Sequence, residues 1–168
     1  MRMSFMVVSS WLAFLAGCAP PKPDVVFDTT FPTKQIMAHI INPAAVGLWG
    51  RAGTWEDENG VEDLAPDTPD QWAEAENEAA IVAEGGNLLL LPGRIRVLEE
   101  GDNGDWSRFA LQLVAQAREV KIATEARDKE RMFDAGGDLY QVCVACHEKY
   151  YVPFLEEGET TAAPRKND

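Results

Sequence analysis

The residues with the clearest chemical potential are two cysteines and a histidine near the carboxyl end of the chain. Cys143 and Cys146 are three residues apart, and His147 follows at once. On a helix this spacing brings both thiols to one edge, where they can add to the two vinyl groups of a porphyrin. It also places His147 one turn after Cys143, within reach of the iron. The pattern predicts a covalently attached haem c.

A redox-active dithiol and half of a zinc site use the same cysteine spacing. A zinc site needs a second cysteine pair or a second nearby histidine, and the chain has only Cys18 and His39 besides the motif. A redox dithiol usually begins a helix that follows a strand, whereas this pair stands at the end of a helical pattern. Haem attachment is therefore the favoured interpretation.

The acidic composition restricts the class of partner. The chain has 168 residues, 15 Lys and Arg against 28 Asp and Glu, and a formal net charge of −13. This length indicates one domain. The charge argues against nucleic acid, because phosphates would be repelled. An acidic face can instead steer docking to a basic redox partner, although solubility alone would also account for it.

Residues 1–17 are typical of an export signal. Arg2 precedes an apolar run from Phe5 to Ala16, which is too short for a comfortable membrane span. The residues Leu15-Ala16-Gly17-Cys18 resemble the bacterial lipoprotein signal, which implies lipidation of Cys18; an ordinary signal peptide with an incidental cysteine is the alternative. Residues 18–32 carry four prolines and are interpreted as a tether. A periplasmic protein, held at a membrane by Cys18, is expected.

Four amphipathic patterns are predicted between residues 33 and 155. The first carries Met37, Ile40, Ile41, Ala44 and Leu48 on one face and ends near Trp49. Pro43 should kink or restart it. Residues 52–68 are interpreted as an acidic loop from which Trp55 folds back on the helices.

The other three patterns have clear start and stop signals. They begin at Thr68-Pro69, Asp105 and Asp128, and Pro92-Gly93 and Pro153 should end the second and the fourth. Gly85-Gly86 permits either close approach of a flat cofactor or a close helix crossing. With no strand signal, the sequence predicts an all-α, antiparallel four-helix bundle with haem near the C-terminus, followed by a disordered tail at 156–168.

The stretch Leu139 to Tyr150, with the haem motif on the last helix, resembles the class II c-type cytochromes, the cytochrome c′ group. The resemblance covers roughly residues 33–154. In class I cytochromes the motif comes early and a distal Met lies far downstream, but no Met follows His147 here. The resemblance implies that the distal side of the haem faces the first helix. Members commonly carry an early Arg there, where this chain has Lys34.

The distal iron ligand is the most open question. Met37 is the sulfur on the apolar face of the first helix and is our candidate, with an open site as the alternative. His39 is the rival, but it lies about 200° around the helix from Met37 and on a more polar side. Arg94, with Arg96, is a candidate for a haem propionate, and a solvated loop is the alternative.

These residues indicate an electron carrier rather than an enzyme, because no acid–base or nucleophile constellation accompanies the haem motif. The expected function is a mono-haem cytochrome that passes single electrons between periplasmic or membrane proteins. The alternative is a five-coordinate haem protein that binds small gases such as nitric oxide. An accessory subunit of a larger complex and a homodimer are also compatible with the sequence.

Overall fold

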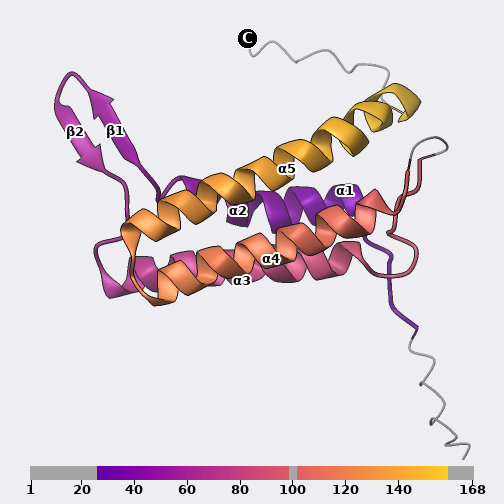
Figure 1. Ribbon diagram of the computed structural model, residues 1–168, viewed down its shortest axis with the longest axis horizontal. Coiled ribbons are helices and arrows are strands. Elements are labelled where there is room, and N and C mark those ends of the chain that lie inside the picture. Colours follow the sequence, from indigo (N-terminus) through magenta and orange to yellow (C-terminus); the bar gives the residue numbers. More distant parts are fainter. Residues whose placement is uncertain (1–25, 99–101, 159–168) are drawn as a thin grey trace, which may run out of the picture.

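The structure is a computed structural model that describes residues 26–98 and 102–158, without the side chains of 152–158 (Figure 1). The predicted export signal, Cys18 and most of the predicted tether therefore lie outside the described residues. Residues 26–32 of that tether form neither helix nor strand. No described helix is long and apolar enough to cross a membrane.

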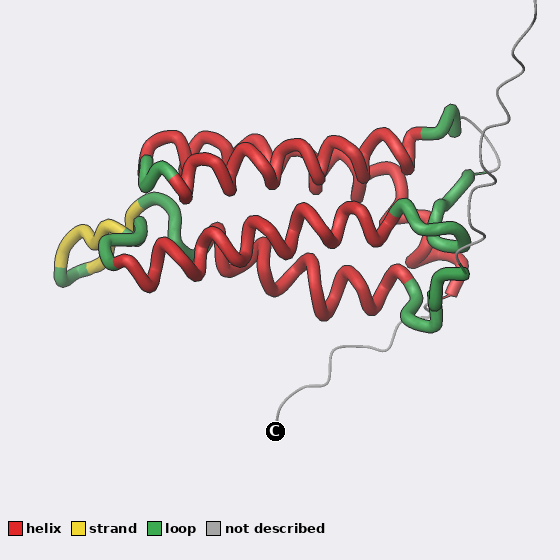
Figure 2. The backbone as a smooth tube through the Cα atoms, turned by 90° about the horizontal axis from the view of Figure 1, so that it is seen from below, coloured by secondary structure: helices red, strands yellow, loops and turns green. Residues whose placement is uncertain are grey.

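Four helical elements pack together along the long axis of the molecule, and consecutive elements alternate in direction (Figures 1 and 2). The first consists of α1 (Thr33–Ile36), the π-helix η1 (Met37–Ile41) and α2 (Asn42–Trp49), which together we call the N-terminal helical run. The others are α3 (Pro69–Leu89), α4 (Asp105–Glu125) and α5 (Lys129–Gly158). The N-terminal helical run packs on α3, α3 on α4, and α4 on α5. The mostly helical fold predicted from the sequence is confirmed.

The predicted starts of α3 and α5 are confirmed by their caps. The Thr68 hydroxyl accepts a hydrogen bond from the Gln71 backbone N–H at 3.2 Å, and the Gln71 side chain accepts one from the Thr68 N–H at 3.2 Å. This reciprocal pair satisfies two donors that a helix start leaves free. The Asp128 carboxylate caps α5 by accepting from the Arg131 N–H at 3.0 Å.

The restart expected at Pro43 takes the form of a π-helix. Pro43 has no backbone N–H, so the regular pattern of α-helical hydrogen bonds cannot continue through it. In η1 the bonds reach one residue further back, and the Asn42 N–H donates to the Met37 carbonyl. The widened turn lies directly before Pro43, and α2 then continues to Trp49.

The apolar stripes predicted for α3 and α4 are confirmed as the core. Gly85 and Gly86 serve close helix packing rather than cofactor approach. A Cβ on Gly85 would lie 2.4 Å from Ile41 Cγ1, and one on Gly86 would lie 2.7 Å from Val114 Cγ2. Buried residues of the stripes include Trp72, Ala75, Ala79, Val82 and Leu89 on α3, and Trp106, Ala110, Leu113, Ala117, Val120 and Thr124 on α4.

The interpretation of residues 52–68 as a loop is wrong in its centre. Strands β1 (Thr54–Asp57) and β2 (Gly60–Asp63) form an antiparallel hairpin that projects from one end of the helices (Figure 1). The Asp57 carboxylate accepts from the Asn59 N–H at 2.7 Å, and Gly60 takes a φ of +135° that favours glycine. Trp55 does not fold back: its exposed fraction is 60%.

The prediction that Pro153 ends the last helix is also wrong, because α5 continues to Gly158. A proline removes only its own backbone donor, so a helix can pass it with the loss of one hydrogen bond and a bend. Residues 156–158 of the predicted tail are therefore helical. Residues 159–168 lie outside the described residues.

Candidate functional site

The cysteine and histidine motif lies in the middle of α5. Cys143 and Cys146 are free thiols, both are half-buried, and both pack against the apolar core. His147 is exposed. The predicted placement of the motif on the last helix is therefore confirmed, but its expected position at the end of that helix is wrong, because α5 continues to Gly158. The two thiols are directed to the inside of the molecule rather than to its outer surface.

One face of α5 turns towards the N-terminal helical run. The Trp49 indole N–H donates to the Gly136 carbonyl at 3.2 Å, and the Trp49 ring stands edge-on to Tyr140 with centroids 5.5 Å apart. Cys143 and His147 follow Tyr140 by three and seven residues, so they share its face of the helix. Cys143 and His147 thus face the N-terminal helical run, on the same side as Trp49.

Met37 lies at about the same level as His147 along the bundle. Trp49 sits beside Gly136 and Tyr140. Counted back from Trp49, Met37 is roughly 18 Å away, and His147 is roughly 10 to 16 Å from that same level along α5. Because the two elements run in opposite directions, both offsets point to the same end of the molecule (Figure 1). Met37 is half-buried and packs against the core.

α5 and the N-terminal helical run pack only lightly on each other. Gly136 is buried, yet a Cβ on it would meet no heavy atom within 4 Å. Beyond the Trp49 contact, α5 packs chiefly on α4, and the N-terminal helical run packs chiefly on α3. Half-buried apolar side chains of both elements pack against the core, among them Met37 of the N-terminal helical run and Val142, Cys143 and Cys146 of α5. The residues present therefore fit a haem held at Cys143 and Cys146.

Burial keeps both thiols protonated. It raises the pKa of Cys143, and it raises the pKa of Cys146 to about 11, an effect that the neighbouring Cys143 increases and Arg108 partly offsets. A redox-active thiol usually has a lowered pKa, because the thiolate is the reactive form, so these shifts do not favour a redox dithiol.

His147 has the protonation state that iron binding requires. Although the residue as a whole is exposed, partial desolvation of the ring lowers its pKa, so the imidazole is neutral at neutral pH. Its ring lies 5.6 Å from that of Tyr151, one turn further along α5. Within the described part of the chain, no group of three or more His, Cys, Asp or Glu side chains is placed to hold a metal ion by itself.

Charged residues of α4 that were not predicted to lie near the motif are beside it. Asp105 accepts from Lys149 on α5 and, at 2.7 Å, from Arg108 Nη2. Arg108 also stacks over the Phe109 ring at 4.2 Å. The spacing of Asp105 and Arg108 on one helix could have revealed their pairing, but the link to Lys149 depends on the packing of α4 against α5.

A second polar contact holds the end of the motif. Tyr150 is buried, its hydroxyl donates to the Asp102 carboxylate at 2.8 Å, and its ring packs edge-on against Trp106. Asp102 also accepts from the backbone N–H groups of Leu98, Gly104 and Asp105. The hydrogen bonds to Asp102 hold the turn of α5 that follows His147 against the start of α4.

The structure does not bring Arg94 to the motif. Arg94 is buried rather than solvated, with an exposed fraction of 5%, and its Nη1 donates to the Leu88 carbonyl at the end of α3. Its Nε is buried without a hydrogen-bond partner. The described contacts give Arg94 the role of a helix C-cap, and the predicted propionate contact has no support in them.

His39 is placed away from the motif. It is exposed and lines an open groove between the N-terminal helical run and α3, together with Ile40, Pro43, Ala44, Glu78 and Ile81. No residue of α5 lines this groove. The described contacts therefore give His39 no link to the motif, and Met37 or an open site stays the prediction for the distal side.

Comparison with protein-family models, with curated proteins and with solved structures finds no match to this chain.

Proposed function

We propose that this protein is a mono-haem c-type cytochrome that carries single electrons. The observation that carries the proposal is the placement of Cys143 and His147 on the α5 face that Trp49 marks as directed towards the N-terminal helical run, with Cys146 half-buried against the core beside them. Cys143 and Cys146 would hold the haem through thioether bonds, and His147 would bind the iron. The haem would supply a one-electron redox centre, and the half-buried apolar side chains around it would limit the access of water.

The covalent bond is the direct test of this function. We expect the full chain, expressed with a periplasmic haem-attachment system, to keep its colour after denaturation and extraction with acidic acetone. The Cys143→Ser/Cys146→Ser variant should release all of its colour, because a serine hydroxyl forms no thioether with a vinyl group. The Ala145→Ser variant changes an exposed residue between the two thiols and should behave as the wild type. Complete extraction of colour from the wild type would refute the proposal.

The proposed location is the periplasmic side of a membrane, through a lipid on Cys18. Cys18 lies outside the described residues, and its resemblance to a lipoprotein signal supports this part of the proposal. The Cys18→Ser variant should incorporate no labelled palmitate and should leave the membrane fraction. Equal palmitate incorporation in the variant and the wild type would exclude Cys18 as the lipidation site.

A further inference from the structure

The β1–β2 hairpin is an ordered element with almost no support from the helices. All eight strand residues are exposed. At its base the Leu64 N–H donates to the Gly53 carbonyl and closes the hairpin, and Asp63 pairs with Lys129 of α5 at 2.9 Å. An isolated two-stranded hairpin is marginally stable in water, and an exposed apolar surface often marks an interaction site.

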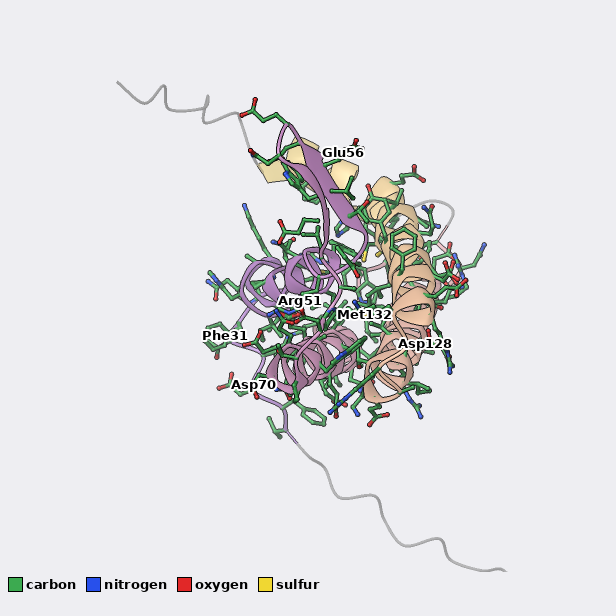
Figure 3. All side chains as sticks on the ribbon, turned by 90° about the vertical axis from the view of Figure 1, so that its left-hand side faces the viewer. Phe31, Arg51, Glu56, Asp70, Asp128 and Met132 are labelled. Carbon is green, nitrogen blue, oxygen red and sulfur yellow. The ribbon has the colours of Figure 1, made fainter. Side chains whose placement is uncertain are left out.

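The ladder places Trp55 on the outer face of this hairpin. Trp55 is directly opposite Glu62, and Asp57 is two residues further along the same strand, so the three side chains leave the same face. Asp63 lies on the other face, and there it reaches Lys129 on α5. The Trp55 face is therefore turned away from that contact. In Figure 3 the hairpin, labelled at Glu56, stands clear of the helices.

The charge of the hairpin restricts what can bind to it. Residues 54–63 contain no Lys or Arg and five carboxylates, those of Glu56, Asp57, Glu58, Glu62 and Asp63. Hydrogen bonds, first from Asn59 and then from Trp55, keep the pKa of Asp57 below its usual range, so it is charged at neutral pH. Nucleic acid, an anionic membrane and a second copy of this chain, with its net charge of −13, would all be repelled.

We infer that the hairpin face formed by Trp55, Asp57 and Glu62 is a docking site for a Lys or Arg side chain on the basic surface of a partner protein. An indole face attracts a cation, and the two flanking carboxylates add charge and hydrogen-bond acceptors. Tryptophan is also the residue most enriched among side chains that dominate binding energy. The inference rests on the hairpin alone and stands whether or not the chain carries haem.

The test uses the full chain and a blocked peptide of alternating Arg and Gly, with a Glu and Gly peptide as the control ligand. On ¹⁵N-labelled protein, the Arg peptide should shift the Trp55 indole signal and the backbone amides of residues 54–63, and the Glu peptide should not. Trp55→Ala and Glu62→Lys should each weaken binding of the Arg peptide by about tenfold or more, because both remove direct contacts to the cation.

The matched control is Glu84→Lys, which makes the same charge change at an exposed position on α3. It should change the affinity by less than about twofold at physiological salt, where charges further away than about 8 Å are screened. Equal loss of affinity in Glu84→Lys and Glu62→Lys would show that only overall charge matters and would overturn the inference. Unchanged affinity in Trp55→Ala, or shifts outside the hairpin alone, would overturn it as well.

Discussion

The proposed function depends most on which way one face of α5 points, the face of Tyr140, Cys143 and His147. Trp49 connects the N-terminal helical run to Gly136 and Tyr140, and Cys143 and His147 follow on the same face. The contact is small, but it fixes which way the motif points. Without this contact, nothing would show which side of α5 faces the N-terminal helical run.

Substitution of single residues can test whether Met37 is the distal iron ligand. We predict that Met37→Ala abolishes the sulfur-to-iron charge-transfer band at the red edge of the visible spectrum of the oxidised, haem-loaded protein. The reason is that Met37 lies at the level of His147 on the opposite element, and thioether ligation favours the reduced iron, which suits a carrier. The reduction potential of Met37→Ala should fall accordingly.

His39→Ala is the control for this prediction, because His39 lines a groove that no α5 residue reaches. It should leave both the band and the potential unchanged. If the wild-type protein lacks the band and its reduced form binds carbon monoxide readily, the iron site is open. Gas binding would then replace electron transfer as the favoured function.

Alanine substitutions at two glycines, Gly86 on α3 and Gly137 on α5, distinguish the effect of helix packing on stability from that of helix propensity. Gly86→Ala should destabilise the protein by about 1 to 3 kcal/mol, because its Cβ would meet Val114 Cγ2 at 2.7 Å and the Ala110 carbonyl at 3.1 Å. Gly137→Ala should stabilise it by about 0.5 to 1 kcal/mol, because its Cβ meets nothing within 4 Å and alanine favours a helix. Urea unfolding of both variants measures the two changes.

The signs of these two changes matter more than their sizes. A stabilising Gly86→Ala would mean that α3 and α4 are not in close contact there. A destabilising Gly137→Ala would mean that the exposed side of α5 at Gly137 is covered by another group in solution.

The helices were predictable because their signals are local. Thr68 with Gln71, Asp128 and the three- and four-residue apolar spacing each act within a few residues. The hairpin had a local signal too, in Asn59-Gly60, but its strands are acidic and both faces are exposed, so the usual alternation of polar and apolar residues is absent. The burial of Arg94 and the pairing of Asp105 with Lys149 depend on tertiary packing and had no signal in the sequence.

At the scale of the whole molecule, the haem should contribute to stability. The N-terminal helical run and α5 touch each other through Trp49 but pack mainly on α3 and α4, respectively. A ligand that binds the native state alone stabilises it. We therefore predict that the Cys143→Ser/Cys146→Ser variant, purified without haem, melts at a lower temperature than the holoprotein and loses helical signal.

Circular dichroism during a thermal scan tests this prediction. The Ala145→Ser holoprotein is the control, since it carries the haem and one added hydroxyl. An apoprotein with the same helical signal and the same midpoint would mean that side chains already fill the space beside α5.

The π-helix has a consequence for how the chain tolerates changes in length. A π-turn accommodates one residue more than an α-turn, so η1 behaves as an insertion absorbed within a helix. Deleting the exposed Ala38 would restore an ordinary α-turn and rotate everything before it by roughly 100° relative to α2. The side of the helix on which the Met37 sulfur lies therefore depends on a residue count, and a relative that lacks this extra residue would present a different side chain in its place.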